Sequence, residues 1–348
     1  MAAHETHDLD SLLDEDVLRA LSGAGAFSVR LPNELVALNA EVLRWFGLFD
    51  AQPSERKQRH ALVPDGTGEN NGWHGPGGLS AYNRFRDGYI FQASEPIWSM
   101  LDGSAGAEFA AAHERWRAAL HAVGHALIAR LARALEVGAD QFGPGGRCDI
   151  AAGAQFHLKA IRAAASELCA PGATGATADG RMMTLPAHRD PSVLSLVVAT
   201  RPGLQLLVEG EGRYEDVPRC GPDVCTVIAG QLLTKLTRGL VRSPLHRVVS
   251  EPREAVCAER VAATFFFQPP LDAVLQPLES PTMARLARLA DASPERSARA
   301  HTKVRAGGER GNGKPFLPVT YREWKHRAYS GYYARAAASA GAARLDSA

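Results

Sequence analysis

Three residues of the sequence have the types and the spacing of a transition-metal site. His188 and Asp190 are separated by a single residue, and His246 follows later in the chain. On an extended strand alternate side chains point the same way, so His188 and Asp190 should face one side while Arg189 faces the other. Two imidazoles and one carboxylate bind one face of a metal and leave the opposite face open, as in the facial triad of non-haem Fe(II) enzymes. The three residues therefore predict an iron site, although an H-x-D pattern alone has low specificity.

The elements that must position these ligands are short β-strands. Between about residues 149 and 268 the sequence changes to short β-rich runs separated by turn signals. The expected strands are 155–161, 193–199, 204–208, 224–228 and 261–267. Several short strands in one block are typical of a sandwich or a barrel.

Helices are expected on both sides of this β-rich block. The spacing of apolar residues is helical in several stretches, and capping residues begin or end some of them. The expected helices are 9–21, 33–46, a short one that begins at Ser54, 107–135 and 321–338. A strand is expected over 26–31, and the glycine-rich stretch 64–79 and the low-complexity stretch 171–180 are expected to be loops.

Further motifs accompany the three candidate ligands in a fixed order. They are Gly-Leu-Gln-Leu-Leu-Val at 203–208, Gly-Gln-Leu-Leu-Thr at 230–234, Ser-Pro-Leu-His-Arg-Val at 243–248 and Arg-Val-Ala-Ala-Thr-Phe-Phe at 260–266. This order resembles the isopenicillin N synthase-like family of Fe(II)/2-oxoglutarate-dependent dioxygenases. The family includes deacetoxycephalosporin C synthase and enzymes of the 1-aminocyclopropane-1-carboxylate oxidase type. The resemblance covers most of the chain and is most specific in its catalytic half.

The resemblance implies a mainly β fold with flanking helices, built on a double-stranded β-helix, which is a jelly-roll, cupin-like barrel. Residues 1–145 would form a helical and mixed N-terminal region, and residues 146–275 the catalytic barrel. Residues 276–348 would form a C-terminal helical extension over the barrel mouth. Variable loops and extensions on a rigid barrel are where substrate specificity is usually placed.

The same resemblance implies the cofactor and the co-substrates. Fe(II) would be held by His188, Asp190 and His246, and it would react with 2-oxoglutarate and O2. The distal carboxylate of 2-oxoglutarate needs a buried cation, and Arg260 occupies the family's position for it. A guanidinium pairs with a carboxylate through two hydrogen bonds and stays charged when buried, which suits this role. The alternative for Arg260 is an arginine at a strand edge in a surface ion pair.

One departure from the family concerns the co-substrate carboxylate. The family usually shows Arg-x-Ser, whereas this chain has Arg260-Val261-Ala262, so the serine hydroxyl is missing. The loss of one such hydrogen bond costs on the order of 1 kcal/mol, which weakens binding without preventing it. Thr264 on the same strand face, or Thr234 on a neighbouring strand, would be the substitute hydroxyl. The departure also leaves open an oxidase that uses no 2-oxoglutarate, as isopenicillin N synthase does.

A second departure lies in the expected strand 155–161. Many relatives carry an Asn-Tyr pair where this chain has Lys159 and Ala160, so a tyrosine contact to the co-substrate is absent. Lys159 either anchors an acidic group of the substrate or co-substrate, or is a solvated lysine on the barrel rim.

The predicted activity is the oxidation of an unactivated C–H bond of a small molecule, with succinate and CO2 formed from 2-oxoglutarate. Hydroxylation is the default outcome, and desaturation, ring formation and ring expansion remain open. The family resemblance favours secondary metabolism, such as antibiotic biosynthesis. A more distant alternative is a binding protein that keeps the barrel without catalysis.

Composition excludes several other classes of protein. The 39 Lys and Arg against 38 Asp and Glu give a net charge of +1, so no global field favours nucleic acid or a membrane surface. The sequence shows no apolar run of membrane-spanning length and no secretory signal, so we expect a cytoplasmic protein, with a monomer favoured. Its five cysteines show no C-x-x-C spacing and are expected to be free thiols.

His121 and His125 offer a rival metal motif. They have the i, i+4 spacing of a helical zinc pair, but residue 122 is Ala where a metalloprotease needs its glutamate. We therefore expect them to be structural histidines of the helix 107–135.

Overall fold

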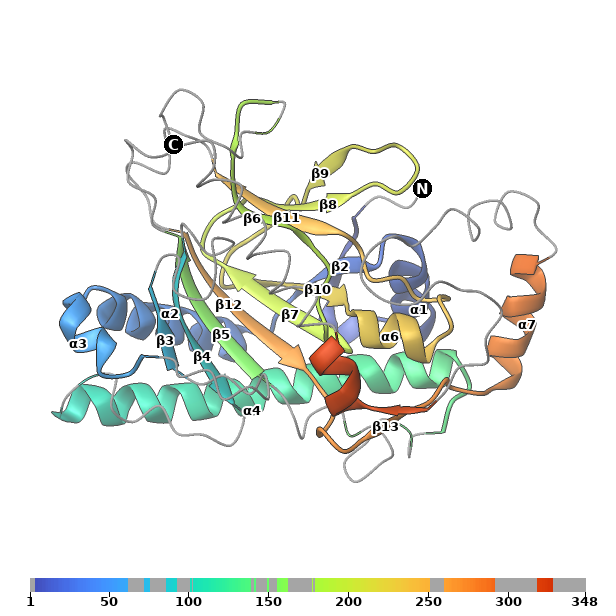
Figure 1. Ribbon diagram of the computed structural model, residues 1–348, viewed down its shortest axis with the longest axis horizontal. Coiled ribbons are helices and arrows are strands. Elements are labelled where there is room, and N and C mark those ends of the chain that lie inside the picture. The colour runs from blue at the N-terminus through green and yellow to red at the C-terminus, as the bar shows by residue number, and fades with distance from the viewer. Residues whose placement is uncertain are drawn as a thin grey trace.

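The computed structural model describes residues 4–61, 72–75, 86–92, 101, 103–138, 141, 149, 155–161, 177, 179–250, 260–291 and 318–327. Their strands form two main sheets that lie one above the other, with a row of helices on the outer side of the larger sheet (Figure 1). The fold is therefore mostly β with flanking helices. The described pairings leave the two sheets separate rather than joined into one closed barrel.

The larger sheet has eight strands in the order β1-β2-β10-β7-β12-β5-β4-β3. Its strands are β1 (Thr6–Asp8), β2 (Ala26–Arg30), β3 (Gly72–His74), β4 (Arg86–Gln92), β5 (Gln155–Ile161), β7 (Leu194–Ala199), β10 (Val224–Ala229) and β12 (Arg260–Phe267). The smaller sheet has four strands, in the order β6-β11-β8-β9. They are β6 (Met182–His188), β8 (Leu204–Leu207), β9 (Tyr214–Asp216) and β11 (His246–Ser250).

The flanking helices cover the larger sheet on the side away from the smaller one (Figure 1). The helices before the β-rich block are α1 (Asp14–Gly23), α2 (Asn33–Asp50), α3 (Ser54–Gln58) and α4 (Gly103–Ala134). In β12, Val261, Ala263, Phe265 and Phe267 belong to the same hydrophobic core as the buried face of α4. Successive strand residues alternate between faces, so Arg260, Ala262, Thr264 and Phe266 point to the other side, toward the smaller sheet.

A close contact fixes α4 against β12. A Cβ at Gly124 of α4 would lie 1.7 Å from the ring of Phe267, so only glycine lets the helix approach this far. This contact holds the end of β12, the strand that begins with Arg260.

The predicted strands and helices are largely confirmed, but the first helix, the stretch 64–79 and the last helix differ from the prediction. The first helix begins only at Asp14, because a 3-10 turn occupies Leu9–Ser11. Strand β3 lies inside the stretch 64–79 that was expected to be a loop, and it is held by pairing with β4. The helix expected over 321–338 is seen over 321–327, and the rest of it lies outside the described residues. Most of the expected loop 171–180 also lies outside them.

The described residues 260–291 and 318–327 of the C-terminal part pack against the rest of the described molecule. Helix α7 (Pro281–Asp291) follows β13 (Val274–Leu275), which pairs with β14 (Val319–Thr320). Tyr321 is 1% exposed and belongs to the main hydrophobic core. Within the described residues, no helix is both long and apolar enough to span a membrane.

Candidate metal centre

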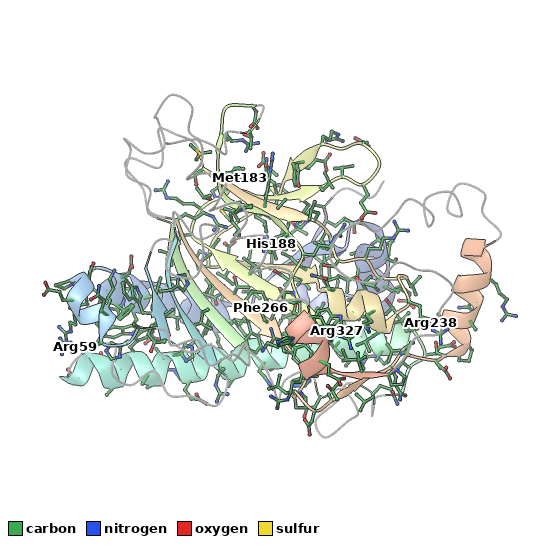
Figure 2. The ribbon with its side chains drawn as sticks, in the orientation of Figure 1. Arg59, Met183, His188, Arg238, Phe266 and Arg327 are labelled. Carbon is green, nitrogen blue, oxygen red and sulfur yellow. The ribbon has the colours of Figure 1, made fainter. Side chains whose placement is uncertain are left out.

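His188 and His246 are brought together by strand pairing in the smaller sheet. His188 is the last residue of β6, His246 is the first residue of β11, and the two are direct partners in the antiparallel register. Their ring centroids lie 4.2 Å apart. In Figure 2 the labelled His188 lies in the space between the two sheets.

Asp190 completes the cluster from the turn that follows β6. Its Oδ1 lies 3.5 Å from Nε2 of His188 and 3.6 Å from Nε2 of His246. One ligand atom from each of the three residues lies within 4.8 Å of the others. The predicted extended strand ends at His188, yet the side chains of His188 and Asp190 still converge as predicted, while Arg189 forms an ion pair with Glu209.

Both histidine rings are oriented by the carbonyl two residues earlier. Nδ1 of His188 lies 2.9 Å from the carbonyl oxygen of Pro186, and Nδ1 of His246 lies 3.2 Å from that of Pro244. In a neutral ring a donating Nδ1–H leaves Nε2 with a lone pair, and both Nε2 atoms face Asp190. The repeated Pro-x-His pattern thus presents two metal-ready nitrogens.

The start of helix α6 (Gln231–Leu236) holds the turn that carries Asp190. The backbone N–H of Gln231 donates to the carbonyl of Asp190 at 2.8 Å, and its side-chain Nε2 donates to the carbonyl of Arg189 at 2.9 Å. A Cβ at the preceding Gly230 would lie 1.8 Å from the carbonyl oxygen of Ser192. This backbone approach requires glycine, and it fixes the turn from Asp190 to Ser192 against α6.

The electrostatics of the cluster favour an anionic carboxylate. Burial opposes ionisation of Asp190, but His246 and His188 outweigh it and hold its pKa well below the usual range. Burial, together with the neighbouring His246, lowers the pKa of His188. Burial also acts to lower the pKa of His246, but the Asp190 carboxylate dominates and raises it.

This donor set fits a divalent transition metal. Asp190 and His246 are each 4% exposed, so the carboxylate and one of the two imidazoles are largely removed from solvent. Two imidazole nitrogens and one carboxylate oxygen suit Fe(II), and both imidazoles must be neutral at Nε2 to bind it. Among the described residues, these three form the one group of three or more potential ligands.

Arg260 lines a cleft between the two sheets, together with residues of β7, β8 and β10. The arginine is 7% exposed, and its Nε donates to the carbonyls of Arg201 and Pro202 at 3.1 and 3.2 Å. The Arg260 side chain is therefore largely buried and not on the surface. Leu204, which also lines the cleft, is two residues along β8 from Leu206, the register partner of His246. The cleft therefore lies about 7 Å along the strands from the metal ligands.

The other predicted co-substrate residues have different outcomes. Thr264 lies on the same face of β12 as Arg260 but does not line the cleft. Thr234 was expected on a strand, but it lies in α6, where its hydroxyl bonds to the carbonyl of Gly230 and accepts the backbone N–H of Ser243. This prediction was wrong because the sequence Gln-Leu-Leu-Thr-Lys-Leu forms a short helix. The backbone of Lys159 pairs with Ala262, and its side chain lies outside the described residues.

His121 and His125 form no metal site among the described residues. Their rings contact one another at 4.6 Å between centroids and pack near Phe267, at 6.1 and 6.3 Å. The prediction that they are structural histidines of the long helix is consistent with this packing.

Residues that sequence reasoning missed are Gly230, Gln231 and Thr226. Thr226 of β10 is 5% exposed and lines the same cleft as Arg260. A polar residue at an inward position of a strand that is otherwise apolar was the available signal. Gly230 and Gln231 contact backbone atoms of the turn after β6, and Gln231 does so with both its backbone N–H and its side chain, so the sequence pattern does not show these contacts.

Part of the β-rich block matches a known family model. Residues 173–269 match a family model described as "2OG-Fe(II) oxygenase superfamily". None of the curated proteins compared with the chain matches it. The matched segment contains all three candidate ligands and Arg260.

Several solved structures of other proteins have a fold similar to that of this chain. Neurospora crassa T7H, in a complex with alpha-KG and thymine, has 16% identity and a TM-score of 0.69, over 97% of this chain and 97% of its own. Dioxygenase for auxin oxidation 1 from Arabidopsis thaliana, in a 2-oxoglutarate complex, has 18% identity and a TM-score of 0.61, over 79% and 96%. JOX2, in complex with 2OG, Fe and JA, has 16% identity and a TM-score of 0.63, over 92% and 84%.

Proposed function

We propose that this chain, which is an Fe(II)/2-oxoglutarate-dependent dioxygenase by its catalytic core, oxidises an unactivated C–H bond of a small molecule. Fe(II) would be held by His188, Asp190 and His246, and the distal carboxylate of 2-oxoglutarate by Arg260. The observation that carries the proposal is the convergence of the three ligand atoms within 4.8 Å, inside the segment that matches the oxygenase superfamily. We propose that the two sheets are the two halves of the double-stranded β-helix of that superfamily.

When bound, the iron supplies the redox chemistry that couples conversion of 2-oxoglutarate and O2 to succinate and CO2 with oxidation of the substrate. For hydroxylation the balance is one O2 consumed, with one oxygen atom in succinate and one in the product. The protein's own contribution is to position the reactants and exclude water.

The residues of the chain divide this work by their positions. The Pro186 and Pro244 carbonyls aim the two imidazoles, and Gln231 holds the Asp190 turn, so the ligand set is preorganised. The positive charge of Arg260 would attract the distal carboxylate of 2-oxoglutarate. This would orient the co-substrate with its keto acid toward the three ligands. The apolar walls of the cleft, among them Val197, Leu204 and Val217, would exclude water from the co-substrate.

The substrate is proposed to be a small molecule. The structural neighbours were crystallised with thymine and with JA, both small ligands. Hydroxylation is the proposed default outcome, and secondary metabolism the proposed setting, in keeping with the resemblance to the isopenicillin N synthase-like family. Residues 1–145 and 276–348 would flank the core 146–275 and shape the substrate side. Thr264 and Lys159 remain proposed contacts to the substrate or co-substrate.

A screen for substrate-dependent succinate release tests this proposal. The Fe(II)-loaded protein would be incubated with 2-oxoglutarate, O2 and a library of small metabolites, and succinate would be measured. Products would be analysed by mass for a gain of one oxygen or a loss of two hydrogens. Turnover of a substrate without 2-oxoglutarate, or in an Arg260→Gln variant at the wild-type rate, would contradict the proposed role of this co-substrate.

A further inference from the structure

We infer that the hydroxyl of Thr226 donates the hydrogen bond to the distal carboxylate of 2-oxoglutarate that the missing Arg-x-Ser serine would have donated, and that Ser28 and His4 aim this hydroxyl. The inference rests on the proposed function, because it needs Arg260 to be the carboxylate partner. Thr226 is then a binding residue of the co-substrate, and Ser28 and His4 are positioning residues.

The cleft needs a hydroxyl from outside β12. Ala262 stands where the family's serine would be, and its register partner on β7 is Ala199, so two methyl groups face each other beside Arg260. A carboxylate has about four acceptor sites, and a single guanidinium satisfies only part of them. A buried carboxylate with unsatisfied oxygens is costly, so a second donor in the cleft would strengthen binding.

Thr226 is placed to be that donor. Thr226 and Val224, two residues apart on β10, both line the cleft with Arg260, as expected for alternate residues of one strand. Its register partner on β7 is Val197, which also lines the cleft. The two threonines considered from the sequence are worse placed, because Thr264 does not line the cleft and Thr234 is engaged in α6.

A chain of polar contacts behind Thr226 sets the direction of its proton. Thr226 pairs with Ser28 across β10 and β2, and their hydroxyl oxygens lie 3.4 Å apart. The Ser28 hydroxyl lies 2.8 Å from Nε2 of His4. Ser28 is 0% exposed, so this chain runs through the interior from the N-terminal segment to the cleft.

The three hydrogen-bond donors in this series of contacts, on His4, Ser28 and Thr226, can all point toward the cleft. Nδ1 of His4 is buried and has no hydrogen-bond partner among the described residues. An orphaned N–H is rarer than an orphaned lone pair, so the proton of the neutral ring belongs on Nε2. Burial lowers the pKa of His4 to about 4, which keeps the ring neutral near pH 7. His4 then donates to Ser28, Ser28 donates to Thr226, and the Thr226 proton is left for an acceptor in the cleft.

Binding to the metal-loaded protein tests the inference without turnover. The protein would be loaded with Mn(II) and titrated calorimetrically with 2-oxoglutarate or with 2-oxobutyrate, which has the same keto-acid end but no distal carboxylate. The variants are Thr226→Val, which removes the hydroxyl at nearly constant shape, Thr226→Ser, which keeps it, and the double variant Thr226→Val with Ala262→Ser, which supplies a hydroxyl at the family's position.

We expect Thr226→Val to weaken 2-oxoglutarate binding about tenfold and to leave 2-oxobutyrate binding unchanged. Thr226→Ser should bind 2-oxoglutarate within about threefold of wild type, and the double variant should regain most of the loss. Ser28→Ala should weaken 2-oxoglutarate binding less than Thr226→Val does, because it removes only the aiming contact. Equal weakening of both ligands, or wild-type affinity of Thr226→Val for 2-oxoglutarate, would overturn the inference.

The proposed function fails in a different way. If the wild-type Mn(II) protein does not bind 2-oxoglutarate, or Arg260→Gln binds it as tightly as wild type, the co-substrate site itself is wrong, and the Thr226 inference is overturned with it. If Arg260→Gln loses affinity while Thr226→Val does not, only the inference is overturned. If Thr226→Val does not fold, the single variant Ala262→Ser decides the matter. With Thr226 already donating, the added serine should improve affinity less than threefold, and a gain of tenfold or more would contradict the inference.

Discussion

His188 and His246 are direct partners across an antiparallel strand pair, the last residue of β6 opposite the first residue of β11. Strand register therefore fixes the distance between two of the three candidate ligands, and Asp190 joins them from the next turn. We expect a site built on paired strand ends to change little when a metal binds, because the backbone is already hydrogen-bonded into the sheet.

Removal of His246 should remove the metal site. We expect His246→Ala to weaken Mn(II) binding by more than about 100-fold, since loss of a direct ligand should exceed the 10–100-fold effect of losing an outer partner. Calorimetric titration of the apoprotein measures this. His125→Ala is the matched control, a histidine removed from α4, and should bind Mn(II) as wild type does. Tight metal binding by His246→Ala would show that the ligand set is wrong.

We expect the glycine before α6, Gly230, to be required for stability and for metal binding. Gly230→Ala places a methyl group 1.8 Å from the Ser192 carbonyl, so the turn that carries Asp190 must move. We expect a loss of about 1–3 kcal/mol in the free energy of unfolding, and weaker Mn(II) binding. Gly47→Ala in α2 is the control, because no atom lies within 4 Å of the added methyl group. That variant should gain up to about 1 kcal/mol from helix propensity and bind metal normally. Wild-type metal affinity in Gly230→Ala would show that the contact between Gly230 and the turn is not needed to position Asp190.

Arg260 should discriminate among 2-oxoacids by the charge at their far end. Arg260→Gln should cost about 2 kcal/mol or more in 2-oxoglutarate binding, or about thirtyfold in affinity, because a carboxylate in the cleft loses its charge partner. Arg260→Lys should lose less, since it keeps the charge but not the two-pronged geometry. Affinities measured on the Mn(II) protein would contradict the assignment if both variants bound 2-oxoglutarate as wild type does.

A buried histidine should make the protein less stable in mild acid. His113 of α4 packs beside Trp116, and burial, with a smaller contribution from Arg117, lowers its pKa from 6.5 to about 3. The unfolded chain binds the proton more readily, so the stability from this group is full above about pH 6.5 and is lost as the pH falls toward 3. At pH 5.5 the loss should be on the order of 1 kcal/mol relative to neutral pH.

Urea unfolding at pH 7.5 and 5.5 measures this dependence. His113→Leu should remove this part of the pH dependence, although the buried His4 contributes in the same direction and keeps some of it. An identical pH dependence in His113→Leu and wild type would show that His113 is not the responsible group.

The candidate ligands could be predicted from the sequence because their signal is local. An H-x-D pattern on a strand end needs only the two-residue period of a strand, and the strands of the core carry regular apolar runs. In contrast, the local sequence does not predict which residue of another strand lies beside a given residue. The placement of Thr226 in the cleft with Arg260 depends on the register of β2, β10, β7 and β12, which the sequence does not encode locally.

Two errors concern short segments whose conformation is not decided by their own sequence. Thr234 was expected on a strand because its neighbours are apolar, and short apolar runs do not distinguish a helical turn from a strand. Strand β3 was hidden in a glycine-rich stretch, because its pairing with β4 and not its own propensity makes it a strand. Gly230 and Gln231 contact backbone atoms of the Asp190 turn, so no pairing of side-chain types in the sequence predicts these contacts.

The most direct test of the central claim is an anaerobic titration of the apoprotein with Fe(II) and then with 2-oxoglutarate, followed by visible absorption. The account predicts a charge-transfer band that appears only when both are present and saturates at one 2-oxoglutarate per chain. The band should be absent in the His246→Ala variant. A wild-type protein that binds Fe(II) but shows no band with 2-oxoglutarate, or a band of full size in His246→Ala, would contradict the claim that these residues form an Fe(II)/2-oxoglutarate site.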